Sequence, residues 1–199
     1  MQPKQPDITR DKVLEAAFCE IHRSGFQAAS IANILASTGL TKGALYHHFP
    51  TKQALGLAVV DEVVYRRLDE RFFTPLRQSD QPLDTLLGIL DNIAERAQEL
   101  VTLGCPLNNL MQEMSPLDPA FKERLGAVLH AWREAVEIAL RRSQEQGGLR
   151  ADVDCPAAAL FIVSAWEGCI GIAKNLQSAD ALSVCSRQLQ DFIRSLRTT

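Results

Sequence analysis

The stretch Thr41-Lys-Gly-Ala-Leu-Tyr-His-His-Phe-Pro-Thr-Lys52 decides how the N-terminal part of the chain folds. A threonine hydroxyl can cap a helix, so Thr41 is predicted to begin a short helix that Pro50 ends. Leu45 and Phe49 are four residues apart and would point together into a small core. The remaining, outward side chains are basic, aromatic or small and include no acid. Such a face suits the major groove of DNA, although an ordinary solvated corner between two helices has the same local pattern.

The residues before this stretch complete a three-helix head. Apolar side chains with helical spacing predict a helix over residues 8–24, which Gly25 would end in a left-handed conformation. Ser30 is placed to begin a second short helix that runs to residue 37, and Gly39 lets the chain turn before the next one. A short helix, a glycine-bearing turn and a second short helix make a helix-turn-helix.

The rest of the chain shows only helical patterns. Helices are predicted over residues 51–73, 83–101, 107–114, 119–146, 157–176 and 178–197. Pro75 is expected to end the first of them, and the Gly104-Cys105-Pro106 break separates the second from the third. No segment has the alternation of a strand. The predicted fold class is all-α, with an N-terminal helix-turn-helix head, a C-terminal helical bundle and about nine helices.

Composition and cysteine usage limit the classes of protein. Of 199 residues, 46% are hydrophobic and 23% charged, which is ordinary for a globular chain. No apolar run approaches the roughly 20 residues of a membrane span, and the polar N-terminus has no secretory signal, so a cytoplasmic protein is expected. The cysteines are odd in number and form no CxxC pair, which favours free thiols over a disulfide framework or a zinc site: Cys19, Cys105, Cys155, Cys169 and Cys185.

Charge is distributed unevenly along the chain. Residues 1–52 contain six Lys or Arg and four Asp or Glu, a net charge of +2, which leaves −5 for the remainder of a chain whose total is −3. Three of the four histidines also lie in this first segment. A mildly basic head on an acidic body is consistent with a head that reads DNA and a body with another task.

At this point the sequence resembles the TetR/AcrR family of transcriptional regulators. The residues that carry the resemblance are Gly25-Phe26, Ser30-Ile-Ala-x-Ile34, Gly39-Leu-Thr-Lys-Gly-Ala-Leu-Tyr-His-His-Phe49 and Lys52-x-x-Leu55. The resemblance implies a homodimer with a DNA-binding head over residues 1–52, from which the linking helix 51–73 leaves, and an effector-binding and dimerisation domain over residues 53–199. It also implies a repressor that a small molecule releases from a palindromic operator in double-stranded DNA.

The motif assigns the DNA contacts residue by residue. Residues 41–44 would approach base edges, and 46–48 would contact phosphates or neighbouring bases. Lys52 and Ser30 would hold the DNA backbone from helix starts. The predicted DNA-binding residues are Ser30, Thr41, Lys42, Gly43, Ala44, Tyr46, His47, His48 and Lys52.

Effector and dimer residues are predicted from the character of the body. Tryptophans can line an apolar pocket or fill the core, and the polar groups that could join them are Asn109, Gln112, Glu113 and Glu167. The predicted effector-binding set is Cys105, Asn109, Glu113, Trp132 and Trp166. Small residues three apart in 165–171 let a partner helix approach, although packing within one chain explains them equally. The predicted dimer interface is Trp166, Gly168, Gly171, Leu189, Phe192 and Ile193.

Three alternatives remain open at this stage. Cys105 precedes a short helix, whose N-terminus lowers the pKa of a thiol, so a repressor that senses oxidants or electrophiles through Cys105 is one. A small cysteine-dependent enzyme is another, but it would need a base, and only His130 lies outside the head. An activator, or a DNA-binding protein without a ligand, is the third. Adjacent His47 and His48 point about 100° apart and lack partners at ligand spacing, so neither a metal nor a cofactor is predicted.

Overall fold

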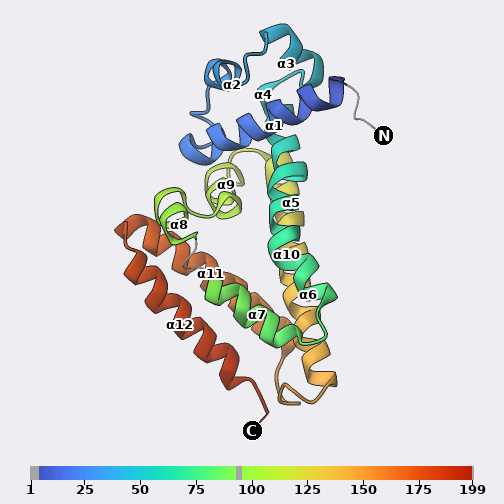
Figure 1. Ribbon diagram of the computed structural model, residues 1–199, viewed down its shortest axis with the longest axis vertical. Coiled ribbons are helices and arrows are strands. Elements are labelled where there is room, and N and C mark those ends of the chain that lie inside the picture. The colour runs from blue at the N-terminus through green and yellow to red at the C-terminus, as the bar shows by residue number, and fades with distance from the viewer. Residues whose placement is uncertain (1–4, 93–95, 199) are drawn as a thin grey trace. The chain divides into compact units, whose positions relative to one another are not determined.

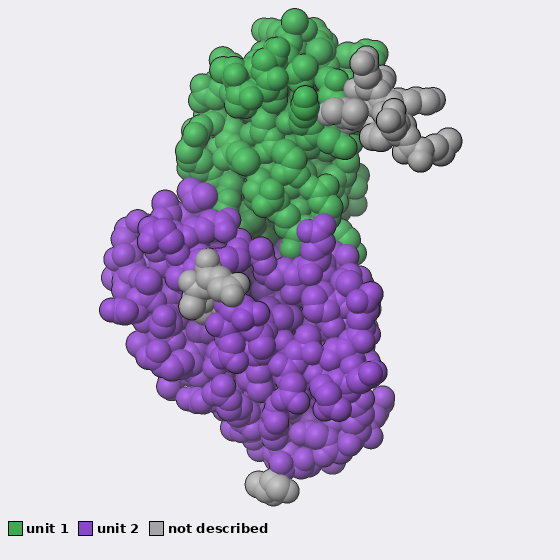
Figure 2. Space-filling model, viewed as in Figure 1, with its two compact units in different colours: residues 1–67, 106–128 green, residues 68–105, 129–199 purple. Residues whose placement is uncertain are grey.

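The computed structural model describes residues 5–92 and 96–198 (Figure 1). Apart from a single bridge between Leu149 and Arg197, the described ranges contain helices and connecting turns without β-structure. The all-α prediction is therefore confirmed. The chain divides into two compact units (Figure 2): unit 1 contains residues 1–67 and 106–128, and unit 2 contains residues 68–105 and 129–199. These units, which are defined by packing, do not coincide with the predicted boundary after residue 52. That boundary separates a DNA-binding region from an effector-binding region, and it stays a prediction.

Unit 1 holds the three-helix head. Its helices are α1 (Gln5–Ser24), α2 (Ile31–Thr38), α3 (Lys42–His48) and α4 (Lys52–Ala58), and it also contains α9 (Pro106–Met114) and the start of α10 (Pro119–Glu145). Gly25 and Gly39 have φ of 80° and 69°, so each turn uses the left-handed conformation that glycine permits. The side chains that α1 and α2 turn inward meet those of α3 and α4 in a common core: Leu14, Phe18, Ile21, Ile34, Leu45, Phe49 and Leu55.

The linking helix is longer than predicted. After α4 it continues through a π-helical segment η1 (Val59–Val64), then α5 (Tyr65–Leu68), a second π-helical segment η2 (Asp69–Phe73) and α6 (Thr74–Gln78). The expectation that Pro75 ends it is wrong. The Thr74 N–H bonds to the Asp69 carbonyl five residues back, so the backbone is wider just before the proline. That widening accommodates a ring that would clash in a regular α-helix.

Unit 2 contains the C-terminal helices and the helices after the linking helix. Where one helix was predicted over residues 83–101, the structure has α7 (Pro82–Asp91) and α8 (Ala97–Leu103). Asn92 ends α7 with a ψ of 5°, and the predicted core positions Ile93 and Ala94 lie outside the described residues. The long helices α11 (Cys155–Leu176) and α12 (Ala179–Ser195) begin at Asp154 and Ser178, whose side chains accept the capping hydrogen bonds.

A disulfide joins α11 to α12. Cys169 and Cys185 are bonded, with their Cα atoms 5.6 Å apart. The expectation that the cysteines are free thiols is therefore wrong for Cys169 and Cys185. It is correct for Cys19, Cys105 and Cys155. The two bonded residues belong to different helices, so only the packing of these helices brings their Cα atoms within bridging distance.

Helix α11 is apolar around most of its circumference. By length and composition it meets the criteria for a helix that could cross a membrane, in contrast to the expectation from the sequence. Half of its most apolar window is nevertheless buried inside the folded chain, as in the core helix of a globular domain. The exposed apolar remainder includes Leu160, Phe161 and Ile172.

Candidate DNA interface and effector cavity

Helix α3 is held at both ends by its own sequence. Thr41 lies in the extended region, and its Oγ1 accepts a hydrogen bond of 3.2 Å from Ala44 N. Phe49 leaves helical geometry before Pro50, and Thr51 caps the next helix by accepting from Ala54 N at 2.9 Å. Because both caps are local, the orientation of the short helix follows from the stretch that contains it.

The inward and outward faces of α3 are as predicted from its spacing. Leu45 is 0% and Phe49 3% exposed, and the Arg10 guanidinium lies 5.1 Å from the centre of the Phe49 ring. Lys42, Gly43 and His47 are exposed, whereas Ala44, Tyr46 and His48 are half-buried. The outward face of α3 (Thr41, Lys42, Gly43, Ala44, Tyr46, His47 and His48) therefore contains no acidic group.

Side chains at the helix starts are more strongly engaged with the head than the sequence indicates. Ser30 caps α2 by accepting from Asn33 N at 3.4 Å. The Lys52 ammonium donates to the Gln27 carbonyl at 2.9 Å and lies 5.1 Å from the centre of the Phe26 ring. Lysine carries three donors, so this contact orients the ammonium without using all of them. Its role at a DNA phosphate stays a prediction.

A buried carboxylate fixes the start of α2. Glu20 is 5% exposed, accepts from Ser30 N at 3.1 Å and from Asn33 Nδ2 at 2.8 Å, and pairs with Arg23. Burial alone would raise the pKa of Glu20, but these donors outweigh it and hold the pKa below its usual value. The carboxylate thereby ties α1 to the first turn of α2.

A second carboxylate reaches the same part of the head from α9. Glu113 accepts from Phe26 N and from Gln27 N, each at 2.8 Å. A Cβ added at Gly25 would lie 3.0 Å from a Glu113 oxygen, so the turn also requires glycine there. Glu113 was expected in the effector pocket, and the structure gives it a different role because both its oxygens hold this turn. The other α9 residue predicted for the effector, Asn109, is half-buried in the same unit.

The two tryptophans meet around one phenylalanine in unit 2. Trp132 and Trp166 are 2% and 6% exposed, and their rings lie 4.8 and 5.7 Å from the ring of Phe72. Trp166 also lines a cavity of about 270 Å³, the candidate effector cavity, together with Arg71, Phe72, Ile89, Asn92, Arg96 and Leu100. The sequence did not predict Phe72, Arg71 or Arg96 as cavity residues. Their positions in the helical pattern are the same as those of ordinary core or surface residues.

Cys105 and Glu167 are also brought together in unit 2. Cys105 is 6% exposed, and its side chain lies beside the Glu167 carboxylate. No N–H or O–H group of the described residues reaches either oxygen of Glu167. Burial raises the pKa of Glu167 to about 7, which the weak thiol donor Cys105 counteracts only in part.

The predicted dimer residues divide into two groups. Trp166, Leu189 and Ile193 are buried within one chain, so they add little to a surface that a second chain could cover. Gly168 and Gly171 are exposed on α11, and Phe192 is half-buried on α12, where its ring lies 4.6 Å from that of Phe161. The described residues hold no group of three or more His, Cys, Asp or Glu that could bind a metal ion.

Two family models match the chain. Residues 13–59 match the model described as bacterial regulatory proteins, tetR family, and residues 82–189 match that of the tetracyclin repressor-like C-terminal domain. The second match alone spans more than half of the chain. The protein belongs to the TetR family.

Individual relatives of this TetR-family protein match it over most of its length. It is 31% identical over 185 residues to the transcriptional regulator AcuR of Cereibacter sphaeroides. This alignment covers 90% of this chain and 83% of AcuR. The crystal structure of a TetR transcriptional regulator from Chloroflexus aurantiacus superposes with a TM-score of 0.87 at 30% identity, over 98% of this chain and 99% of that one. The transcriptional repressor DhaR of Mycobacterium is 24% identical over 153 residues, 73% of this chain and 72% of DhaR. The family consists of ligand-responsive DNA-binding transcriptional regulators, not of enzymes.

Proposed function

We propose that this TetR-family protein is a homodimeric repressor whose α3 helices read a palindromic operator. The observation that carries the proposal is the acid-free outward face of α3, fixed by two local caps and by the buried Leu45 and Phe49. Lys42 would read guanine edges, and Gly43 and Ala44 allow the helix to approach the bases closely. Lys52 and Ser30 lie at helix starts, where a lysine and backbone N–H groups suit phosphates.

Two-fold symmetry sets the form of the operator. If each protomer places one α3 in a major groove, the half-sites lie about one helical turn apart, roughly 34–36 Å. The protein would act in the cytoplasm, where its DNA is accessible. Neither a membrane nor a metal has a part in this function.

The dimer interface we propose differs from the one expected from sequence. It retains Gly168, Gly171 and Phe192, and it adds the exposed apolar side chains of Phe161 and Ile172 on α11. Glycines let a partner helix approach closely, and burying exposed apolar side chains favours association. The buried Trp166, Leu189 and Ile193 support this surface from inside one chain.

A small molecule in the candidate effector cavity would change the affinity for the operator. Arg71 and Phe72 line this cavity and belong to one continuous helical stretch, which begins at Lys52 directly after α3 in the chain. An effector that binds preferentially when this stretch has another position would weaken DNA binding. Converting a population from 1:99 to 99:1 requires a preference of about 5.5 kcal/mol between the two states.

The test begins with the DNA that the purified protein selects from fragmented genomic DNA of its source. Fluorescence anisotropy with the selected site and with random DNA measures specificity, and sedimentation measures the oligomeric state. Lys42→Ala should weaken the preference for the selected site. Lys122→Ala, an exposed lysine of α10 in the same unit, is the matched control and should keep that preference. Equal affinity of the unaltered protein for selected and random DNA would contradict the proposal.

A further inference from the structure

The candidate effector cavity is lined by buried apolar side chains and by more exposed cationic ones. Phe72, Leu100 and Trp166 are buried, whereas Arg71 and Arg96 are half-buried. The described residues that line the cavity include these two arginines and no acid, and all of them belong to unit 2. Such a cavity suits a ligand with an apolar body and an anionic end.

Arg96 binds a carboxylate in the folded chain. Its Nε and Nη2 donate to Glu99 Oε2 at 3.1 and 2.9 Å. The two side chains are 28% and 39% exposed, so their ion pair contributes little to stability and can exchange for another. A guanidinium carries five N–H donors in a planar fork that matches a carboxylate. The carboxylate of a ligand can therefore share Arg96 with Glu99 or replace it.

Two aromatic rings meet at the cavity. The ring centres of Phe72 and Trp166 lie 5.7 Å apart, with their planes at 82°. The ring of Trp132 packs on Phe72 at 4.8 Å and holds it in place. Aromatic rings gain from edge-to-face and offset contacts beyond the area that they bury, so a third ring fits this pair better than an aliphatic group does. A volume of about 270 Å³ limits the ligand to a small molecule.

We propose that the candidate effector cavity binds a small aromatic carboxylate with a single ring. The carboxylate pairs with Arg96, and Arg71 adds a second positive charge. Asn92, which is exposed at the end of α7, donates an amide N–H to the same group. The ring of the ligand packs against Phe72 and Trp166. The regulatory role of this ligand rests on the proposed function, whereas its binding does not.

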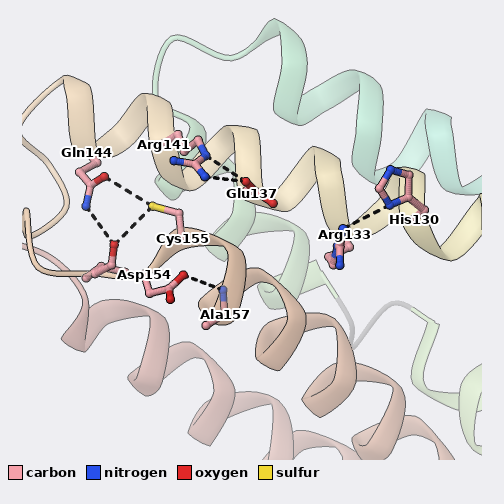
Figure 3. A network of polar contacts seen from close by, with 9 residues as sticks. His130, Arg133, Glu137, Arg141, Gln144, Asp154, Cys155 and Ala157 are labelled. Carbon is pink, nitrogen blue, oxygen red and sulfur yellow. Dashed lines mark hydrogen bonds and ion pairs between the residues drawn. The ribbon is translucent and has the colours of Figure 1, made fainter.

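Arg141 provides a matched control within unit 2 (Figure 3). Its Nε donates to Glu137 Oε1 at 2.9 Å, and its Nη2 lies 2.8 Å from the same oxygen. This pair therefore has the geometry of Arg96 and Glu99, but Arg141 does not line the candidate effector cavity. Arg141→Gln removes one positive charge from an equivalent ion pair and leaves the cavity unchanged.

The binding test is isothermal titration calorimetry of the full-length protein, without DNA, with benzoate and three analogues. Benzoate should bind about tenfold tighter than benzamide, because hydrogen bonds to an ionised acceptor are stronger than those to a neutral one. It should bind about threefold tighter than cyclohexanecarboxylate, which keeps the charge and lacks the aromatic ring. Equal affinity for either analogue, tighter binding of phenyl phosphate, or no benzoate binding at millimolar concentration overturns the proposed ligand class.

Variants of the two ion pairs test the position of the carboxylate. Arg96→Gln should weaken benzoate binding about tenfold and leave benzamide binding unchanged, whereas Arg141→Gln should change neither. Arg96→Lys keeps the charge without the fork, so it should give an intermediate affinity and guards against a folding defect in the glutamine variant. Glu99→Gln removes a competing carboxylate and should tighten benzoate binding about twofold to threefold, with Glu137→Gln as its control. Unchanged benzoate affinity in Arg96→Gln overturns the site.

The regulatory role is measured by fluorescence anisotropy with the selected site. Saturating benzoate should lower the affinity of the unaltered protein for this DNA about tenfold, and the same concentration should have a smaller effect on Arg96→Gln. Benzoate binding without a change in DNA affinity overturns the regulatory role alone. A ligand-free protein that does not distinguish the selected site from random DNA refutes the proposed function, and the calorimetric result is independent of that outcome.

Discussion

The two units differ in the hydrogen bonds that a buried acid receives. In unit 1, Glu20 is 5% exposed and receives hydrogen bonds from Ser30 and Asn33 as well as the Arg23 guanidinium. In unit 2, Glu167 is 7% exposed, and its carboxylate receives no N–H or O–H donor from the described residues and lies beside the Cys105 thiol. The first carboxylate connects two helices of the head, so its charge is part of the fold. The second has no structural partner to hold, which makes it a candidate for chemistry rather than for stability.

A second acid of unit 1, Glu113 on α9, is also held by hydrogen bonds, in contrast to Glu167. Glu113 binds the backbone N–H groups of Phe26 and Gln27 and so defines the turn between α1 and α2. Glu20 and Glu113 therefore both fix the segment that joins α1 to α2. Two hydrogen-bonded acids in unit 1 suit a fixed reading surface, and an acid without N–H or O–H donors among the described residues of unit 2 suits a responsive site.

The largest expected effect comes from exchanging each acid for leucine. Glu20→Leu removes three charge-assisted contacts and leaves Ser30 N–H and the Asn33 amide without their acceptor, so the free energy of unfolding should fall by about 3 kcal/mol. Glu167→Leu removes an unpaired polar group and should leave that free energy unchanged or raise it by about 1 kcal/mol. Urea unfolding at pH 7.5 measures both. Equal losses in the two variants would remove the distinction between the units.

The next largest effect is expected in the pH dependence of stability, where Glu167 and Glu20 should act in opposite directions. The folded-state pKa of Glu167 is raised to about 7 from 4.5, so its contribution is fully present below about pH 4.5 and is lost as the pH rises through 7. Over that window the unaltered protein should lose roughly 3 kcal/mol relative to Glu167→Gln, which does not titrate there. The lowered pKa of Glu20 acts in the opposite direction, since its contribution is lost as the pH falls through the folded-state pKa. A difference between protein and variant that stays constant from pH 4.5 to 8 would show that Glu167 is solvated.

How much of this contrast the sequence reveals depends on the distance along the chain over which each contact forms. Thr41, Thr51 and Ser30 each cap a helix through an N–H three residues away, so the head could be predicted from its own residues. The inward positions of Leu45 and Phe49 follow from helical spacing in the same way.

Contacts between distant segments could not be predicted in this way. Glu113 lies 87 residues from Phe26, and no local pattern distinguishes an acid that holds a turn from one that faces a ligand. Cys169 and Cys185 become partners only once α11 and α12 pack together. Glu167 was recognised as a polar candidate, but its lack of donors is a property of the packed unit.

A smaller effect is expected from the exposed reading surface of the head. Lys42→Ala should reduce discrimination between operator and random DNA by ~1–3 kcal/mol, because a lysine at a guanine edge contributes to specific binding only. Anisotropy titrations with both DNAs measure the ratio of affinities. Lys122→Ala provides the control for loss of one positive charge. If the affinities for both DNAs fall by the same factor in Lys42→Ala, the residue acts through charge alone and does not read bases.

The smallest effect is expected at Lys52, which the head already engages. Its ammonium donates to the Gln27 carbonyl, and Gln27 N–H in turn is bound by Glu113, so this lysine is oriented by the same turn that the acid fixes. If Lys52 also contacts a phosphate, Lys52→Ala should weaken binding to all sequences equally and reduce the slope of log affinity against log salt by about one. Titrations between about 50 and 500 mM salt, one decade of salt concentration, resolve such a change. A weaker affinity with an unchanged slope would mean that Lys52 supports the turn and does not touch DNA, which would place it with Glu20 and Glu113 among the groups whose charge serves the fold.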